Sequence, residues 1–476
     1  MKNIFSILFF IGLSNQVQSQ EVKGKVVDSN SKETIIGASV QLLNSNKETS
    51  TDTNGNFNLE GQGTIEISAV GYRTIQLKSS ADFMTIQLEI DRNELQTVEI
   101  VGRSTKKYNS DYSFAATKTA ALNKDIPQSI STITKELIAD KGAFYLADAV
   151  KMSSGVIPAS YYNQYTIRGI SQNEEGQIIN GMRTRQYYFL QPLTSNIERI
   201  EVIKGPSSAT FSSVDPGGSI NMVTKKPLAI DRKEVSMSVG SFSTLRGTLD
   251  FTGPLNESKT LLYRVNGAYQ QAKSFRDLVN NKSFLISPSF SYIPNEKTAI
   301  NTELILSNMT GVLDRGQPIF GAVAGKTSLN KTPISLNLGA PGDFFKSKEM
   351  ILMTNFAHKF NSKIGFNASY MKQTWTEDLQ EHRTTNAFAV DMNNQPVTNL
   401  AMMQFVQRQQ NWDIDNLSTY FNFDFKTGKL NHKLLTGYDL SSWNKNKGGG
   451  QNAARGYLLN DGTVASTFVL ANASNY

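Results

Sequence analysis

Hydrophobic and polar positions alternate with a period of two through the second half of the chain. From about Lys233, segments of roughly ten residues place apolar side chains on one face and polar ones on the other. Transmembrane β-strands have this pattern, because one face meets lipid and the other faces a lumen. The pattern predicts nine strands, centred on 235–239, 249–251, 263–269, 286–292, 300–306, 352–360, 364–370, 417–425 and 434–440.

The connections between these strands are of two kinds. Residues 294–297, 361–363 and 427–429 predict tight turns, whereas 309–346 and 376–412 are long and polar and predict loops. Short turns on one side of the membrane and long loops on the other are typical of outer-membrane barrels, and they disfavour a soluble β-sandwich or propeller. An odd strand count cannot close such a barrel, so we expect a fragment with unpaired edges that ends in a polar outer segment, 444–476.

A small β-sandwich is predicted near the N-terminus, within residues 20–90. Short alternating runs are separated there by turn residues, and regular short strands of this kind favour a sandwich. The runs are 21–27, 38–43, 56–59, 64–70, 74–77 and 84–88. Asp52 and Asn54 suggest a calcium loop, but the later ligands are missing, so a hairpin turn is favoured.

Residues 124–227 predict a mixed α/β segment. A strand over 125–133 leads to a helix N-cap at Thr134, and Tyr145–Met152 fits a short amphipathic helix. Further strands are predicted at 165–169, 178–181, 197–204 and 219–224. Between the two N-terminal units, residues 91–123 read as a linker. Its β-branched stretch 95–101 favours an extended chain, either a strand that pairs with a partner's sheet or one more sandwich strand.

The composition excludes several classes of protein. There is no cysteine, there are only three histidines, and no phosphate-binding glycine loop is present, which excludes thiolate metal sites and a nucleotide site. A net charge of +7 from scattered lysines disfavours nucleic-acid binding. Residues 1–19 combine Lys2 with a short apolar run over 4–13, which predicts a cleaved signal peptide and export from the cytoplasm.

The motifs of residues 124–227, in their order along the chain, resemble the plug domain of TonB-dependent outer-membrane receptors. The most diagnostic are the strand Ile197–Lys204, the Gly-Pro-Ser-Ser run Gly205–Ser208 and the turn Asp215–Gly218. The last two resemble the ferric-siderophore receptors in particular. The resemblance implies a mainly β fold in which the plug (α+β) lies inside a 22-stranded antiparallel transmembrane β-barrel. Residues 228–476 would then be the N-terminal portion of that barrel, truncated at its C-terminal side.

Two further resemblances concern the N-terminal part. Residues 20–90 resemble the carboxypeptidase regulatory-like sandwich that precedes some of these receptors, through 24–28, 36–38, 51–57 and 71–72. This implies no peptidase activity, since no zinc ligand set is present. The extended stretch lies where the family has its TonB box, so the resemblance favours pairing with TonB. The seven residues are Leu95, Gln96, Thr97, Val98, Glu99, Ile100 and Val101.

The resemblance implies that a ligand binds at outward loops of the plug. Arginines and aromatic side chains suit bulky anionic iron complexes. The candidates are Tyr161, Tyr162, Gln164, Arg183, Arg185, Tyr187 and Tyr188. For each of them a rim side chain or a plug-to-barrel contact remains the alternative. Arg168 and Arg199 are expected to pair with lumen acids such as Glu303 and so fix the plug, because a buried unpaired arginine is costly.

The function implied is that of an outer-membrane receptor, not an enzyme, that binds a ferric siderophore and imports it with energy from TonB. No cofactor or protein metal ligand is expected, because the siderophore itself holds the iron. The expected partners are TonB with its inner-membrane complex, the siderophore and outer-membrane lipid, and no nucleic acid. Import of a glycan, a peptide or cobalamin is the alternative, as is a surface sensor or adhesin.

Overall fold

The computed structural model describes most of the residues from 21 to 459. The residues it describes are 21–29, 32, 34–45, 47–52, 54–69, 72–80, 82–89, 108, 110, 113, 118, 123–159, 162–172, 177–185, 189–205, 215–295, 297–319, 330, 332–361, 363–390 and 393–459. The predicted signal peptide and residues 95–101 therefore lie outside the described residues.

The N-terminal unit consists of two small sheets around one hydrophobic core, as predicted. One sheet has the strand order β4-β1-β7 and the other β3-β2-β5-β6. Val22, Val40 and Ile65 are fully buried between them. The strands are β1 (Glu21–Asp28), β2 (Ser39–Leu42), β3 (Glu48–Ser50), β4 (Asn56–Glu60), β5 (Thr64–Ser68), β6 (Ile75–Lys78) and β7 (Met84–Leu88).

The Asp52 turn of this unit is a tight turn but not the predicted hairpin, because the strands that it joins, β3 and β4, belong to different sheets. The Asp52 Oδ1 atom accepts hydrogen bonds from the backbone amides of Asn54 and Asn56, both at 2.8 Å. Local bonds of this kind are how an aspartate stabilises a tight turn. The carboxylate is thus engaged with its own loop, and the turn connects one sheet of the sandwich to the other.

The plug segment is built on a five-stranded sheet with the order β13-β12-β15-β14-β8. The predicted N-cap is confirmed, because Thr134 Oγ1 accepts from the Leu137 amide at 3.4 Å at the start of α2. The elements are η2 (Asn123–Asp125), β8 (Ser129–Thr134), α2 (Lys135–Asp140), α3 (Leu146–Val150), β9 (Val156–Pro158), β10 (Tyr165–Ile167), β11 (Ile170–Ser171), β12 (Gln177–Ile179), β13 (Met182–Arg183), β14 (Ile197–Lys204) and β15 (Gly218–Thr224).

The rest of the described chain is one antiparallel sheet of nine strands, β16 to β24, paired in sequence order. All nine predicted strands are present. They are β16 (Arg232–Gly240), β17 (Thr244–Pro254), β18 (Leu261–Lys273), β19 (Asn280–Asn295), β20 (Thr298–Val312), β21 (Phe344–Asn361), β22 (Ile364–Val390), β23 (Pro396–Thr427) and β24 (Leu430–Leu459).

The loop predicted over 376–412 is wrong, and so is the end predicted for the last strand before residue 444. Residues 376–412 are mostly strand, since β22 continues to Val390 and β23 begins at Pro396, and β24 continues through 444–459. The strands lengthen from 9 residues in β16 to 32 in β23, so the last three extend far past the apolar stretch. Beyond lipid, neither face of a strand has to be apolar, so alternation no longer marks the strand.

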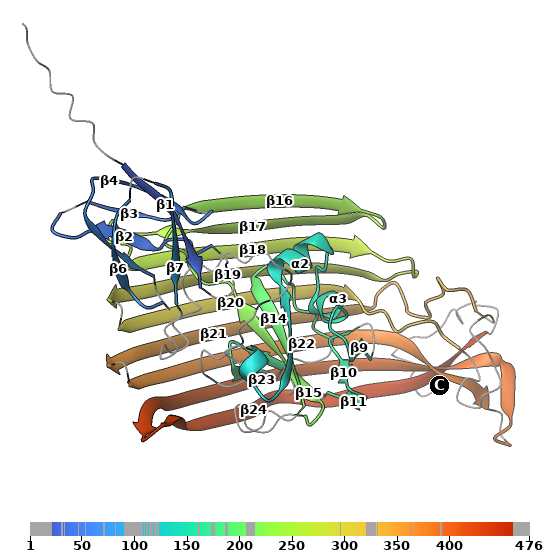
Figure 1. Cartoon of the computed structure of the whole chain (residues 1–476). Coiled ribbons are helices and arrows are strands. Elements are labelled where there is room, and N and C mark those ends of the chain that lie inside the picture. Colours follow the sequence, from blue (N-terminus) through green and yellow to red (C-terminus); the bar gives the residue numbers. More distant parts are fainter. Residues whose placement is uncertain are drawn as a thin grey trace, which may run out of the picture.

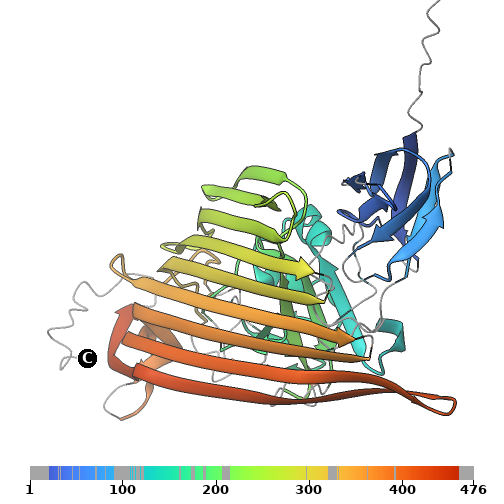
Figure 2. The ribbon, with the colours of Figure 1, turned by 90° about the vertical axis from the view of Figure 1, so that its left-hand side faces the viewer.

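The plug lies against one face of the nine-stranded sheet, and the N-terminal unit lies at the end with the short turns (Figures 1 and 2). A contact at that end is the hydrogen bond from Lys259 Nζ in the β17–β18 turn to Ser50 Oγ, at 2.9 Å. A hydrophobic core joins the plug to the sheet, including Leu146 and Val202 of the plug and Ile305 and Ile351 of the wall. Within the described part, no helix combines the length and apolarity needed to cross a membrane.

Candidate functional site

Besides the shared hydrophobic core, two different sets of side chains join the plug to the wall, one at each end. The inner end lies near the short turns, where the chain leaves β15 through Lys225 and Lys226 and enters β16. The outer end lies toward the extended hairpins of β22 to β24. Outside the described residues are Tyr161, Tyr187, Tyr188 and the whole predicted TonB box.

An arginine–aspartate pair dominates the inner end. Arg264 of β18 is 1% exposed, and its Nε and Nη2 atoms both donate to Asp250 of β17 at 2.7 Å. Its third nitrogen, Nη1, donates to the backbone oxygen of Lys226 at 2.8 Å. Lys225 Nζ also reaches Asp250, at 3.1 Å. A planar guanidinium used in this way fixes both distance and direction, so the end of the plug is held at one position on the wall.

Glu303 of β20 is the second acceptor at the inner end. Its Oε2 atom accepts from Thr224 Oγ1 at 2.5 Å, Lys226 Nζ at 3.2 Å and Asn180 Nδ2 at 3.4 Å, all from the plug or its exit. Its Oε1 atom accepts from the wall residue Ser287 at 3.0 Å. This buried carboxylate is therefore satisfied mainly by the plug, and it is a plug-to-wall contact as the sequence predicted.

The partners that the sequence predicted for Glu303 are wrong. Arg199 pairs instead with Glu201, two residues farther along β14, with Nη2 at 2.7 Å from Oε1. Residues two apart share one face of a strand, so the nearer acid takes the arginine. Arg168 is exposed in a left-handed turn at φ 51°, and no described ion pair joins it to Glu303. Lys226 fills the role that was assigned to these two arginines.

At the outer end, two predicted ligand residues lie against tryptophan rings of the wall. The Arg185 guanidinium carbon is 3.8 Å from the centroid of the Trp412 ring, and that of Arg183 is 4.9 Å from the Trp443 ring. The backbone is held as well, since Asn416 Nδ2 donates to the Arg183 oxygen at 2.7 Å. Both arginines are half-buried. They make plug-to-barrel contacts on the side of the plug that faces the extended hairpins.

The third described candidate of this kind, Tyr162, is buried in an aromatic cluster. Its ring meets Phe189 edge to face at 4.8 Å between centroids, and its hydroxyl donates to the Asp314 backbone oxygen. The cluster includes Phe345 and Trp375 of the wall. Gln164 is half-buried, and its backbone oxygen accepts from the Ala159 amide at 2.8 Å. Tyr162 thus anchors the outer end of the plug.

More arginines surround this aromatic cluster from the wall side. Arg315 lies over the Phe189 ring at 4.5 Å and donates to Glu381 from Nε at 2.7 Å. Arg408 lies over the same ring at 5.5 Å and donates to Glu377 at 2.5 Å. Together with Arg183, Arg185 and Arg383, they place five arginines among the described residues of the outer end, beside the carboxylates of Glu377 and Glu381. This outer arginine–aromatic cluster is suited to a large ligand that has negative charge and flat rings.

The sequence did not point to Arg315, Arg408, Trp412 or Trp443. Three of them lie in segments that were predicted as loops, 309–346 and 376–412, where no strand face was assigned. Residues 375–381 do contain a sequence signal that could have indicated this part of the site. There Trp375, Glu377 and Glu381 share the inward face of β22, but that face mixes charge with aromatic rings and escapes a search for apolar alternation.

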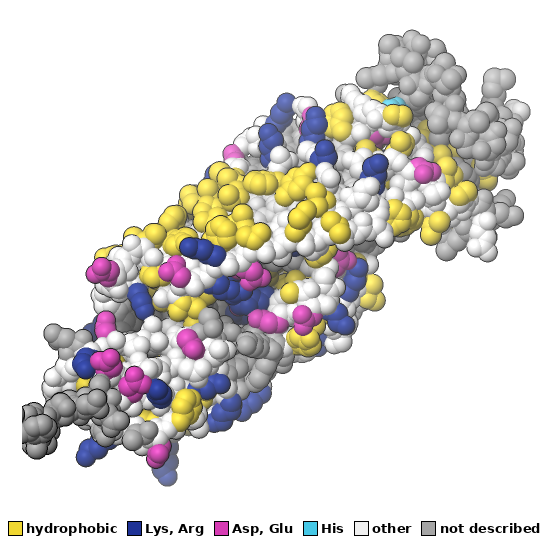
Figure 3. Space-filling model, turned by 90° about the horizontal axis from the view of Figure 1, so that it is seen from above, with side chains coloured by type: hydrophobic (Ala, Val, Ile, Leu, Met, Phe, Trp, Pro, Cys, Tyr) yellow, Lys and Arg dark blue, Asp and Glu magenta, His cyan; other side chains and the backbone are white. Residues whose placement is uncertain are grey.

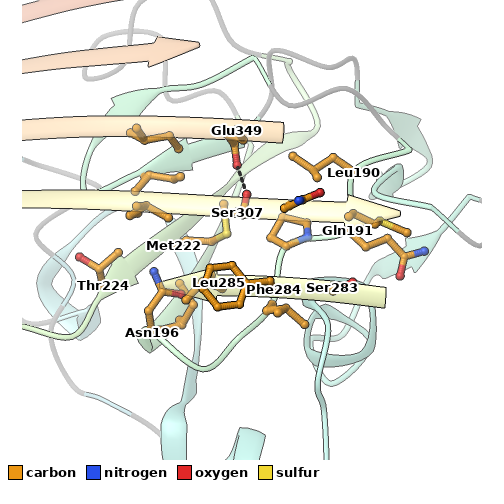
Figure 4. A pocket seen from close by; sticks show the side chains of 18 residues that line it. Leu190, Gln191, Asn196, Met222, Thr224, Ser283, Phe284, Leu285, Ser307 and Glu349 are labelled. Carbon is orange, nitrogen blue, oxygen red and sulfur yellow. Dashed lines mark hydrogen bonds between the residues drawn. The ribbon is translucent and has the colours of Figure 1, made fainter. Parts of the chain in front are cut away.

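A cavity between the plug and the wall is too small to be the ligand site. It is lined by Leu190 and Met222 of the plug and by Leu285, Ser307 and Glu349 of the wall (Figure 4). Its volume of about 40 Å³ holds only a few water molecules. On its wall side, Ser307 of β20 donates to Glu349 of the neighbouring strand β21 at 3.3 Å. The cavity therefore separates the two ends of the interface without offering space for a bulky complex.

The linker between the sandwich and the plug also contacts the wall. Lys118 Nζ lies 3.3 Å from Asp439 of β24 and 3.2 Å from Ser418 of β23, with the side chain 8% exposed. Farther back, the Tyr108 hydroxyl donates to Asp140 at the end of α2, at 2.6 Å. These contacts hold the described linker residues on the plug and the wall. Among the described residues, no cluster of acidic or histidine side chains could hold a metal ion.

The fold and the site define a class of protein, a membrane β-sheet wall that carries a plug on its inner face. Comparison with known families is consistent with this class. Residues 123–219 match the TonB-dependent Receptor Plug Domain and residues 22–101 match the CarboxypepD_reg-like domain. The chain therefore contains the plug domain of TonB-dependent receptors, with a carboxypeptidase regulatory-like domain before it.

Several curated relatives are similar over about 70% of this chain. The metal-pseudopaline receptor CntO of Pseudomonas aeruginosa is 28% identical over 346 residues, which is 71% of this chain and 47% of the relative. The ferrichrome outer membrane transporter/phage receptor of Escherichia coli K12 is 24% identical over 354 residues, 69% of this chain and 47% of the relative. The chain spans about half the length of the curated relatives it matches.

Solved structures share the fold. The ferripyoverdine receptor FpvA of P. aeruginosa, in complex with a pyoverdine and iron, superposes with a TM-score of 0.65 at 19% identity, over 78% of this chain and 48% of that one. The ferric-catecholate import receptor Fiu of E. coli K12 superposes with a TM-score of 0.60 at 24% identity, over 67% of this chain and 50% of that one.

Proposed function

We propose that this protein binds a ferric siderophore, or a similar metal–chelator complex, at its outer side and imports it into the periplasm with energy from TonB. The observation that carries the proposal is the outer arginine–aromatic cluster, where Arg183 and Arg185 of the plug meet Trp412 and Trp443 of the wall. Cations and rings at the outer end of a plug suit an anionic chelate. The named relatives that take up siderophores or metal complexes support the same class of cargo.

In this proposal the ligand itself carries the metal, and the protein is not an enzyme. The ligand approaches from the side of the extended hairpins and competes for the guanidinium groups that now lie on tryptophan rings. Contacts of moderate strength can be exchanged in this way, since a cation–π contact contributes about 0.5–2 kcal/mol. The plug then acts as a lid whose opening gates transport.

The binding step is tested by replacing the two plug arginines. Arg183→Ala with Arg185→Ala should weaken binding of an anionic ferric siderophore by roughly two to four decades, because each charge-assisted contact contributes about 1.5–3 kcal/mol. Isothermal titration with a panel of iron-loaded siderophores measures this. Arg232→Ala, at an exposed position on β16, is the matched control. Unchanged affinity for every chelate that the wild type binds would remove the cluster from the site.

The coupling step depends on the predicted TonB box. Val98→Pro removes a backbone donor and fixes φ, so it should prevent strand pairing with TonB while surface binding persists. Uptake of radiolabelled iron by cells and ligand binding to the same cells separate the two effects. Val98→Thr keeps the donor and the β-branch and serves as the control. Normal uptake by the proline variant would contradict the assignment of residues 95–101.

A further inference from the structure

The plug is held by charges on the side of the wall formed by β17 to β20. Lys225, at the exit of the plug, reaches Asp250 of β17 at 3.1 Å. The next residue, Lys226, reaches Glu303 of β20 at 3.2 Å. Seen from the β16 side of the molecule, basic and acidic side chains lie beside the hydrophobic face of the sheet (Figure 3). The wall toward β22 and β23 has a different lining.

Neutral polar side chains line the inward face of β22 and β23, between the outer arginine–aromatic cluster and the short turns. From Trp412 of the cluster, the inward positions of β23 continue through every second residue to Asn422, about 33 Å farther along the strand. We call this strip the polar seam. Its members are Asn367 and Ser369 of β22 and Asn416, Ser418, Tyr420 and Asn422 of β23.

Several buried polar atoms of the polar seam make no hydrogen bond. Asn367 is fully buried, and its oxygen accepts from Asn355 of the wall at 2.9 Å, but its Nδ2 atom has no partner. The Tyr420 hydroxyl and Asn422 Oδ1 are also without a partner within the described part of the chain. Such atoms lose hydration without a replacement, so they are costly unless another state of the protein uses them. A ligand that passes along the seam would supply the missing partners.

Lys118 of the linker covers the middle of the polar seam. Its Nζ atom lies 3.2 Å from Ser418 Oγ and 3.3 Å from Asp439 Oδ2 of β24. The same atom lies 5.3 Å from the centroid of the Tyr420 ring. The Lys118 backbone has φ 52°, in the left-handed region that residues other than glycine seldom adopt. Contacts with the wall thus hold this residue in a conformation that is unfavourable by itself.

A cavity of about 50 Å³ lies between the outer arginine–aromatic cluster and the polar seam. Its lining includes Arg183 of the plug, Lys118 of the linker, and Asn416 and Ser418 of the wall. Arg183 belongs to the cluster, whereas the two wall residues belong to the seam. The seam therefore begins where the candidate ligand site ends, and Lys118 occupies the junction.

We propose that the polar seam is a second contact surface for the cargo, along which an oxygen-rich metal chelate passes toward the short turns after Lys118 has withdrawn. The amide and hydroxyl groups of the seam suit carbonyl and hydroxyl oxygens, and they hold a ligand less tightly than charges do. The bonded side toward β17–β20 stays in place, so the plug opens on one side. This inference rests on the proposed function, because it assigns a route to the same cargo.

The test measures which side of the plug opens while the full-chain receptor works in cells. The chain has no cysteine, so Ser369→Cys on the seam and Ser289→Cys on the bonded side each introduce a single thiol. Both serines are buried, at 7% and 3% exposure. Ser258→Cys, in the exposed β17–β18 turn, shows that the reagent has access. Labelling by a fluorescent maleimide is followed with and without a ferric chelate, and uptake of radiolabelled iron is measured on the same cells.

With a chelate that the cells take up, labelling of Ser369→Cys should rise by about tenfold or more, because so buried a thiol reacts only when its site opens. Labelling of Ser289→Cys should stay at its resting rate. An equal rise at both positions, a rise at Ser289→Cys alone, or no rise at Ser369→Cys during normal uptake would overturn the proposal. Failure of the wild type to take up any ferric chelate would instead contradict the proposed function, and this inference with it.

The closing role of Lys118 has its own readout, in cells without chelate. Lys118→Met keeps the length of the side chain but removes the ammonium group that pairs with Asp439. Resting labelling of Ser369→Cys should therefore rise severalfold in this background. Lys124→Met, at an exposed position of the same segment, is the matched control and should leave the labelling unchanged. Equal resting labelling in the two backgrounds would show that Lys118 does not close the seam.

Discussion

The two ends of the plug–wall interface are built from different chemistry. At the inner end, Arg264, Asp250 and Glu303 form directed hydrogen bonds that are nearly sealed from solvent. At the outer end, Arg183 and Arg185 lie on tryptophan rings, where a shift of an ångström changes little. Directed bonds define one position, and cation–π contacts tolerate several. The inner end is therefore the more precisely fixed part of the plug, and the arginine contacts of the outer end are the more adaptable part.

The largest expected effect is the loss of folding stability when Arg264 at the inner end is replaced. Arg264→Ala leaves the buried Asp250 carboxylate with Lys225 alone and takes a donor from the Lys226 oxygen, which should lower the free energy of unfolding by about 3–5 kcal/mol. The thermal unfolding midpoint measures this. In contrast, Arg232→Ala removes an exposed pair with Glu234 and should cost at most about 1 kcal/mol. Equal shifts for the two variants would mean that the inner end is not the fixed point.

A substitution at Trp412 tests how strongly the outer end holds the plug. Trp412→Leu removes the ring under Arg185, which should cost about 0.5–2 kcal/mol of plug attachment and should alter ligand affinity more than the unfolding midpoint. Trp412→Phe keeps an aromatic face and should restore most of both quantities. Titration with a ferric siderophore, alongside thermal unfolding, provides the two readouts. A loss of stability as large as that of Arg264→Ala would place a second fixed point at the outer end.

The smallest expected effect is a loss of local stability in the plug at acidic pH. Burial raises the pKa of the Glu198 carboxyl, but Lys135, Arg264 and Lys225 outweigh it, so the pKa lies below its ordinary value of 4.5. Because the folded pKa is the lower one, the ionised group stabilises the plug at neutral pH, and this contribution is lost as the pH falls below about 4.5. Hydrogen-exchange protection of β14 should fall over that window in the wild type. Glu198→Gln should show a flatter profile, and an unchanged profile would contradict this account.

Sequence alone predicted the strands in which apolar side chains facing lipid alternate regularly with polar side chains facing the lumen. All nine wall strands were found because lipid lies on one side of them and the lumen on the other. The same reasoning failed at 376–412, where the strands have left the lipid. The Thr134 cap and the Asp52 turn were predictable because their hydrogen bonds join residues at most four positions apart.

The candidate site was less predictable, because its partners come from distant strands. Arg183 and Arg185 were identified from the plug sequence, but nothing in it indicates Trp412 and Trp443, more than 220 residues away. Glu303 was chosen correctly as a contact of the plug, yet its cation is Lys226. Arg199 pairs with Glu201 because the two residues are neighbours on one face of the same strand, so tertiary folding is not needed to bring them together. Choosing among several possible partners requires the register of the sheet.

The unequal strand lengths have a consequence for how a dissolved molecule reaches the plug. At about 3.3 Å per residue, β16 reaches about 30 Å and β23 about 105 Å, so the wall rises steeply from one side to the other. A molecule diffusing toward the low side passes over the rim and collides with the tall side, whose inward face leads down to the aromatic rings. The raised strands thus enlarge the target that this part of the wall offers to a diffusive encounter.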